Sequence, residues 1–147
     1  MNPEEATEIG RRLKDFCGTV SSYRLLDGSS ARGGTWTAGG CLILAHAMHV
    51  MLSAKGEKTK VAILKNKVPQ HAVCVVRLSN GADAFFDGDG ISRRDGLLRR
   101  WLEEEDVAPP LSIVFPRRYP DVMPVPGGEQ EALKKRLASI FNPRRRK

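Results

Sequence analysis

Apolar side chains recur every three or four positions in four stretches of the sequence, the spacing of helices that bury one face. The first stretch, residues 3–17, opens with a proline after an asparagine suited to cap a helix. The second covers residues 41–54. The third begins at Ser92, which forms a capping-box pattern with Asp95, and ends in the acidic run of residues 103–106. The fourth, near the C-terminal end, carries Leu133, Leu137, Ile140 and Phe141.

Short apolar runs bounded by charged or turn residues predict strands. Residues 60–65 and 111–115 are two such runs. Residues 70–78 and 82–87 flank an Asn-Gly pair at positions 80–81, the strongest short-range hairpin signal in the sequence. The expected fold class is therefore α+β, with helices packed on an antiparallel sheet.

The length of the hairpin loop decides which side chains share a face. A three-residue loop pairs Arg77 with Asp83 and places His71 diagonal to Asp87 on one face. A two-residue loop instead puts Asp87 opposite Cys74, on the face away from His71. We favour the three-residue loop because it brings opposite charges together.

Three residues meet the requirements of an activated thiol. Cys41 follows Gly39 and Gly40 at the start of an apolar helix, where unpaired amides and the helix dipole stabilise a thiolate. A nucleophilic thiol also needs a base and an acceptor that orients the base, which His71 and Asp87 supply from neighbouring strands. The sequence therefore predicts a triad of Cys41, His71 and Asp87, and this chemistry requires no cofactor.

The other two cysteines have simpler interpretations. Strand alternation points Cys74 to the face opposite His71, among apolar neighbours, as a buried structural thiol. Cys17 lies at a helix end, and we expect it to pack as a small apolar residue.

Alternatives to the triad use nearby residues. A zinc site of Cys41, His46 and His49 requires ligands from different faces of one helix. The acidic turn at residues 87–90 is similar to a calcium loop but lacks the third acid and the terminal glutamate. Asp89 replaces Asp87 as the acceptor if the hairpin register slips.

The order of these residues resembles the catalytic core of papain-like and transglutaminase-like proteins. In that family a cysteine opens a helix packed on an antiparallel sheet, and the strands carry a histidine and then an aspartate or asparagine. The positions that follow this core are Gly40-Cys41, Ala45, Leu52, Gly56, Val61, His71 and Asp87. The chain also resembles small bacterial and phage proteins of this group and papain-like toxin deamidases, in the blocks Gly39-Gly40-Cys41-Leu42, His71-Ala72-Val73 and Phe86-Asp87-Gly88-Asp89-Gly90.

The resemblance implies acyl transfer at the amide of a protein or peptide substrate, as a peptidase, deamidase or transamidase. It implies a papain-like or transglutaminase-like core, with Trp36, Gly39 and Gly40 lining the substrate site. No glutamine stands a few residues before Cys41, so the oxyanion donors that remain are the amide of Cys41 and a group within residues 34–38.

Charge changes the expected partners only at the C-terminal end. The 147 residues carry a net charge of +7, but seven of the 24 basic residues lie in residues 134–147, leaving 17 to balance the 17 acidic ones. We expect one domain over residues 1–141 and a basic tail over residues 142–147. An alternative function is a non-catalytic binding protein of bacterial or phage origin whose tail contacts nucleic acid through Arg144, Arg145, Arg146 and Lys147.

Hydropathy and cysteine content suggest a compartment. No apolar run approaches the ~18 residues of a membrane span, so no membrane association is expected. The first residues are acidic, unlike a signal peptide, and three cysteines make a poor disulfide framework. The sequence therefore predicts a cytoplasmic protein, or one exported without a readable N-terminal signal.

Overall fold

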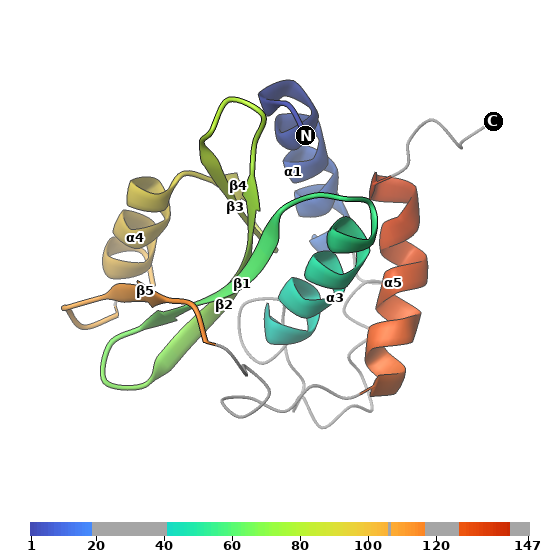
Figure 1. Cartoon of the computed structure of the whole chain (residues 1–147). Coiled ribbons are helices and arrows are strands. Elements are labelled where there is room, and N and C mark those ends of the chain that lie inside the picture. The colour runs from blue at the N-terminus through green and yellow to red at the C-terminus, as the bar shows by residue number, and fades with distance from the viewer. Residues whose placement is uncertain (19–40, 106, 117–126, 142–147) are drawn as a thin grey trace.

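A computed structural model describes residues 1–18, 41–105, 107–116 and 127–141. The described chain forms four helices and five strands (Figure 1). The helices are α1 (Pro3–Cys17), α3 (Cys41–Ala54), α4 (Arg94–Glu103) and α5 (Gly127–Phe141). The strands are β1 (Thr59–Lys65), β2 (Pro69–Arg77), β3 (Asp83–Asp87), β4 (Gly90–Ser92) and β5 (Ser112–Val114).

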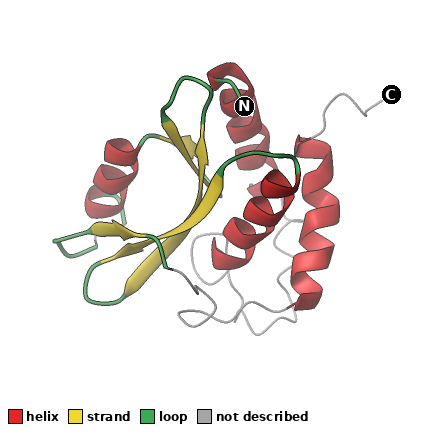
Figure 2. Ribbon diagram, in the orientation of Figure 1, coloured by secondary structure: helices red, strands yellow, loops and turns green. Residues whose placement is uncertain are grey.

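All five strands form one antiparallel sheet in the order β4-β3-β2-β1-β5. Helices α1, α3 and α5 lie on one side of this sheet and α4 lies on the other (Figure 2). The expected α+β class, with helices packed on an antiparallel sheet, is confirmed. Among the described helices, none is long and apolar enough to span a membrane.

The hairpin of β2 and β3 has the register set by the three-residue loop. Arg77 pairs with Asp83, and the Arg77 Nε atom donates to Asp83 Oδ1 at 2.5 Å. The amide of Leu78 donates to the carbonyl of Ala82 at 2.8 Å, which closes the loop. Gly81 adopts a φ of +86°, a conformation that side chains disfavour. The predicted register is therefore confirmed.

The sheet separates two apolar cores. The core under α1, α3 and α5 includes Leu13, Leu44, Met48, Cys74, Phe86 and Leu137. The core under α4 is smaller and consists of Ala62, Leu64, Val73, Val75, Phe85, Leu97 and Trp101. Because β2 and β3 alternate, adjacent residues such as Phe85 and Phe86 belong to different cores.

Helix starts agree with the sequence in one case and differ in another. Asn2 caps α1 in a capping box. The backbone amide of Glu5 donates to the Asn2 side chain, and the backbone amide of Asn2 donates to the Glu5 side chain. The capping box expected at Ser92 is wrong, because α4 has Arg93 as its N-cap with no side-chain cap bond. Ser92 is instead the last residue of β4. Gly90, the first residue of that strand, adopts a φ of +103° at the turn that brings β4 back to pair with β3.

Candidate active site

A buried ion pair joins His71 of β2 to Asp87 at the end of β3. The His71 Nε2 atom lies 2.9 Å from Asp87 Oδ2, and the two residues are 1% and 3% exposed. The confirmed hairpin register explains this contact, because it places both side chains on the α4 side of the sheet. The predicted pairing of these two residues is therefore present in the structure.

The Asp87 carboxylate has two further donors. Arg100 of α4 donates from Nη2 to Oδ2 at 2.6 Å, and the amide of Asp89 donates to Oδ1 at 2.9 Å. Burial raises the pKa of Asp87. The hydrogen bond and charge of His71, the charge of Arg100 and the Asp89 amide lower this pKa by a larger amount, so the net pKa lies below its usual value. The carboxylate of Asp89 points instead toward Arg100, at 3.8 Å, so Asp87 is the acceptor for His71.

Trp101 fixes the plane of the imidazole. Its ring stacks on that of His71, with the ring centroids 4.2 Å apart and the planes inclined by 24°. Trp101 is 5% exposed and belongs to the apolar core under α4. One helix therefore supplies both the ring that covers His71 and the guanidinium that contacts Asp87.

Cys41 approaches the pair from the other side of the sheet. It packs with Val61, Ile63 and Ala72, where α3 rests on β1 and β2. The backbone amides of Leu42 and Ala72 lie near its sulfur and lower the pKa of the thiol.

The Ala72 amide is available because the β2–β3 ladder ends before it. Pairing between these strands stops at Cys74, and the Leu78 amide donates across the hairpin. Amides two residues apart on a strand point the same way, so the Ala72 amide points past the end of β3. This amide and His71 both lower the pKa of the Cys41 thiol.

Cys41 and His71 stabilise each other's charged forms. Burial raises the pKa of the Cys41 thiol, but its interaction with His71 and the two nearby amides outweigh burial, so the net pKa is lowered. Burial lowers the pKa of His71, but its hydrogen bond to Asp87 and its interaction with the Cys41 thiol raise that pKa to about 9. His71 Nδ1 makes no hydrogen bond within the described residues, so it is the ring nitrogen that remains to exchange a proton with the thiol.

The pKa values of the other two thiols are shifted in the opposite direction. All three cysteines are free and buried. Burial raises the pKa of Cys74 to about 12. Burial also raises the pKa of Cys17 far above its usual value, with the negative charges of Asp87 and Asp89 adding to the effect. Only Cys41 has the lowered pKa that favours a thiolate.

His49, one of the residues of the alternative zinc site, makes a contact with a neighbouring strand. His49 Nδ1 lies 2.5 Å from Thr59 Oγ1, a contact between α3 and β1. Over the described ranges, no three His, Cys, Asp or Glu side chains are placed to hold a metal ion together.

Several predicted residues lie outside the described part of the chain. They are the substrate-site residues Trp36, Gly39 and Gly40, the oxyanion range 34–38, and the tail residues Arg144, Arg145, Arg146 and Lys147.

Neither Arg100 nor Trp101 was singled out from the sequence. A signal for both was present. The third helix follows the hairpin after a short connection, so it must fold back over the sheet. Leu97 and Trp101, four residues apart, then face the sheet, and Arg100 flanks them.

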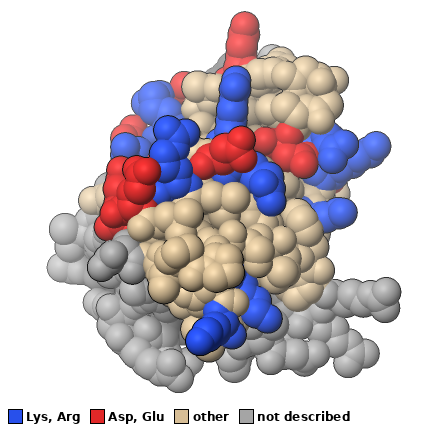
Figure 3. Space-filling model, turned by 90° about the vertical axis from the view of Figure 1, so that its left-hand side faces the viewer, with Lys and Arg blue, Asp and Glu red and all other residues tan. Residues whose placement is uncertain are grey.

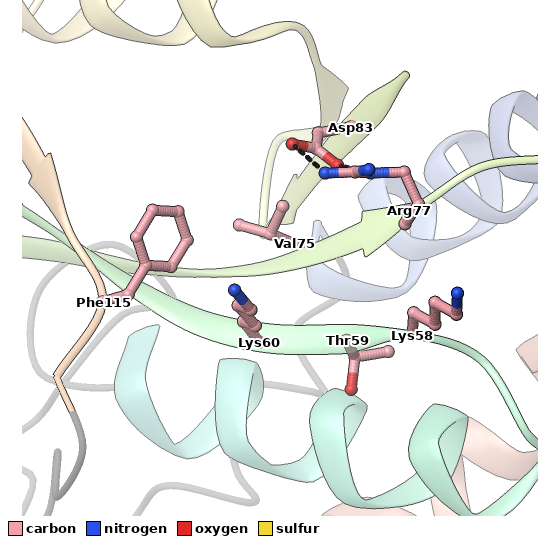
Figure 4. A pocket seen from close by; sticks show the side chains of 7 residues that line it. All are labelled: Lys58, Thr59, Lys60, Val75, Arg77, Asp83 and Phe115. Carbon is pink, nitrogen blue, oxygen red and sulfur yellow. Dashed lines mark hydrogen bonds and ion pairs between the residues drawn. The ribbon is translucent and has the colours of Figure 1, made fainter. Parts of the chain in front are cut away.

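A separate hollow lies farther along the same side of the sheet. It encloses about 410 Å³ and is lined by Lys58, Thr59, Lys60, Val75, Arg77, Asp83 and Phe115 (Figure 4). The Lys60 ammonium lies 5.4 Å from the centre of the Phe115 ring, which is exposed. Basic and acidic side chains are interspersed over the upper part of this side of the molecule (Figure 3). None of Cys41, His71 or Asp87 lines this hollow.

Comparison with known proteins found no match for this chain. No protein-family model matches the sequence, no curated protein matches it, and no solved structure matches the fold. The chemical interpretation of the site therefore depends on its own residues and contacts.

Proposed function

We propose that the protein is a thiol-dependent acyl-transfer enzyme that acts on amides, built on a papain-like or transglutaminase-like core. One observation carries the proposal. The buried imidazole of His71 is hydrogen-bonded to Asp87, its interaction with Cys41 lowers the pKa of that thiol, and neither of the other two thiols has a lowered pKa. This arrangement supplies a nucleophile, a proton carrier and an orienting acceptor.

The proposed reaction has two stages. The Cys41 thiolate attacks the amide carbonyl, and a carbon–sulfur bond forms. The His71 imidazolium gives its proton to the nitrogen as the carbon–nitrogen bond breaks, which releases ammonia or an amine and leaves a thioester. Water or an amine then attacks the thioester, His71 accepts its proton, and the thiolate leaves.

Asp87 selects the tautomer that these steps need. By accepting from Nε2, it keeps that nitrogen protonated and leaves Nδ1 to exchange the proton with the thiol and the substrate. The N-terminus of α3 adds its positive dipole at Cys41, which favours the thiolate. Proteins or peptides are the proposed substrates.

Selective alkylation tests the activated thiol. We expect iodoacetamide at pH 6 to modify Cys41 first, with Cys17 and Cys74 unmodified in the folded protein, as mapped by mass spectrometry of the peptides. His71→Ala should reduce the Cys41 rate at least tenfold because it removes the imidazolium, and the control His49→Ala, on the same helix as the thiol, should not. Equal and slow modification of all three cysteines would overturn the enzyme proposal and favour the binding protein.

The products identify the acyl acceptor. Incubation with unfolded casein, with and without methylamine, yields peptide fragments from a peptidase, ammonia from a deamidase and incorporated methylamine from a transamidase. Cys41→Ala should abolish whichever product forms. A product that persists in this variant would come from another residue and would contradict the assignment of Cys41.

A further inference from the structure

Arg100 and His71 share one carboxylate oxygen. Arg100 Nη2 lies 2.6 Å from Asp87 Oδ2, the same atom that lies 2.9 Å from His71 Nε2. The other carboxylate oxygen, Oδ1, accepts a hydrogen bond from the neutral amide of Asp89. The Arg100 side chain is 20% exposed, so this cation acts in a poorly solvated place.

We propose that Arg100 is a positioning residue that offsets the charge of Asp87 and so keeps His71 able to release its proton. The proposal rests on the proposed function, because it concerns proton exchange at the same site. It adds a role for a residue outside the nucleophile, base and acceptor.

Electrostatics gives the reason. A carboxylate buried against an imidazole stabilises the imidazolium, and a ring that holds its proton too tightly is a poor acid and an unavailable base. A guanidinium on the same oxygen withdraws part of that attraction and also repels the imidazolium. It holds the oxygen in place through a short charged hydrogen bond as well.

The other charged or titratable groups around the pair do not supply this effect. The thiol of Cys41, from α3, favours the imidazolium when it is ionised. The carboxylate of Asp89, 3.8 Å from Arg100, and the thiol of Cys17, from α1, add no positive charge. Among the described residues, Arg100 is therefore the cation besides His71 whose charge acts on Asp87.

A histidine titration by NMR tests the proposal without requiring turnover. The chain has three histidines, so the ring signal of His71 is assigned by its loss in His71→Gln. We expect Arg100→Gln to raise the titration midpoint of His71 by about one pH unit, because the full carboxylate charge then acts on the ring. Arg100→Lys keeps the charge and should shift the midpoint less.

Two further variants separate charge from folding. Arg100→Met keeps an unbranched aliphatic side chain without the charge and should give the same rise as Arg100→Gln. Arg94→Gln removes an exposed arginine at the other end of α4 and should leave the midpoint unchanged. An unchanged or lowered midpoint in folded Arg100→Met would overturn the proposal and leave Arg100 as a link between α4 and the hairpin.

The pH profile of Cys41 alkylation gives a second readout. The upper step of that profile, where the imidazolium loses its proton, should move by the same amount as the NMR midpoint. If wild-type Cys41 is not alkylated selectively, the proposed function fails, whereas the NMR comparison still decides the role of Arg100.

Discussion

The two sides of the sheet use the same strands for different purposes. On β2, Ala72, Cys74 and Val76 face α3, while His71 and Val73 face α4. The α3 side is an apolar core covered by three helices, and the α4 side combines a smaller core with the buried ion pair. Alternation along one strand therefore places packing and chemistry one residue apart, and substitutions at neighbouring positions can separate them.

The cysteines show the same contrast. Cys74 points into the α3-side core, and burial is the one effect that shifts the pKa of its thiol, so this pKa rises. Cys41 starts a helix beside Ala72 and His71, and donors outweigh its burial. Burial is similar for the two thiols, at 0% and 3% exposed, so the local donors decide which one ionises.

The largest expected effect comes from the adjacent phenylalanines of β3. Phe86 is 0% exposed under three helices, and Phe85 is 4% exposed under α4 alone. We expect Phe86→Ala to lower the free energy of unfolding by about 4–5 kcal/mol, near the upper end for buried phenylalanine, and Phe85→Ala by about 3 kcal/mol. Urea denaturation measures both. A larger loss for Phe85→Ala would show that the α4 side carries more of the stability than its smaller core implies.

The next effect concerns the pH dependence of stability. In the folded wild type the His71 pKa is raised to about 9 and the Cys41 pKa is lowered. As pH rises from 6.5 toward 9, the folded chain keeps a histidine proton that the unfolded chain loses, so His71 makes stability fall. The lowered Cys41 pKa acts in the opposite direction, because the folded chain loses the thiol proton at a lower pH than the unfolded chain. The two contributions oppose each other, so the pair gives a smaller slope than His71 alone.

Cys41→Ser removes the compensating thiol. Its unfolding free energy should fall as pH rises above 6.5, by up to about 1.4 kcal/mol per pH unit, until the folded His71 also loses its proton. The matched variant Cys74→Ser loses stability in the core but should keep the wild-type slope from pH 6 to 8, because that thiol is not coupled to His71 and ionises little in either state there. Denaturation at pH 6, 7, 8 and 9 measures the slopes, and a flat profile in Cys41→Ser would mean that His71 is not protonated in this range.

The hairpin shows how much of the site local sequence determines. The turn at residues 80–81 and the charges of Arg77 and Asp83 were sufficient to predict the register. That register placed His71 beside Asp87, and strand alternation separated Cys74 from both. These features are predictable because they depend on period-2 geometry and one turn.

The rest of the site depends on how distant elements dock. The local pattern places Arg100 beside Leu97 and Trp101 but does not specify its contact with Asp87, since that contact depends on how α4 docks on the hairpin. The position of Cys41 past the end of β3 likewise depends on α3 packing against β1 and β2. The strand β4 was missed because the turn at Gly90 leaves only three residues to pair.

The smallest effect compares one glycine from a helix on each side of the sheet. A Cβ atom on Gly10 of α1 would lie 2.6 Å from Ile91 Cγ2, whereas one on Gly96 of α4 would meet nothing within 4 Å. Gly96→Ala should raise the free energy of unfolding by about 0.5–1 kcal/mol, since alanine loses less backbone freedom on folding. Gly10→Ala should lower it by at least about 1 kcal/mol through the forced contact.

Both changes replace glycine by alanine in a helix, so intrinsic helix preference favours both alike, and a difference in sign reports packing alone. Urea denaturation of the two variants in parallel measures that sign. A higher free energy of unfolding in both variants would mean that α1 leaves room for a Cβ atom beside β4. The α1 side would then lack the tight contact that distinguishes it from the open outer face of α4.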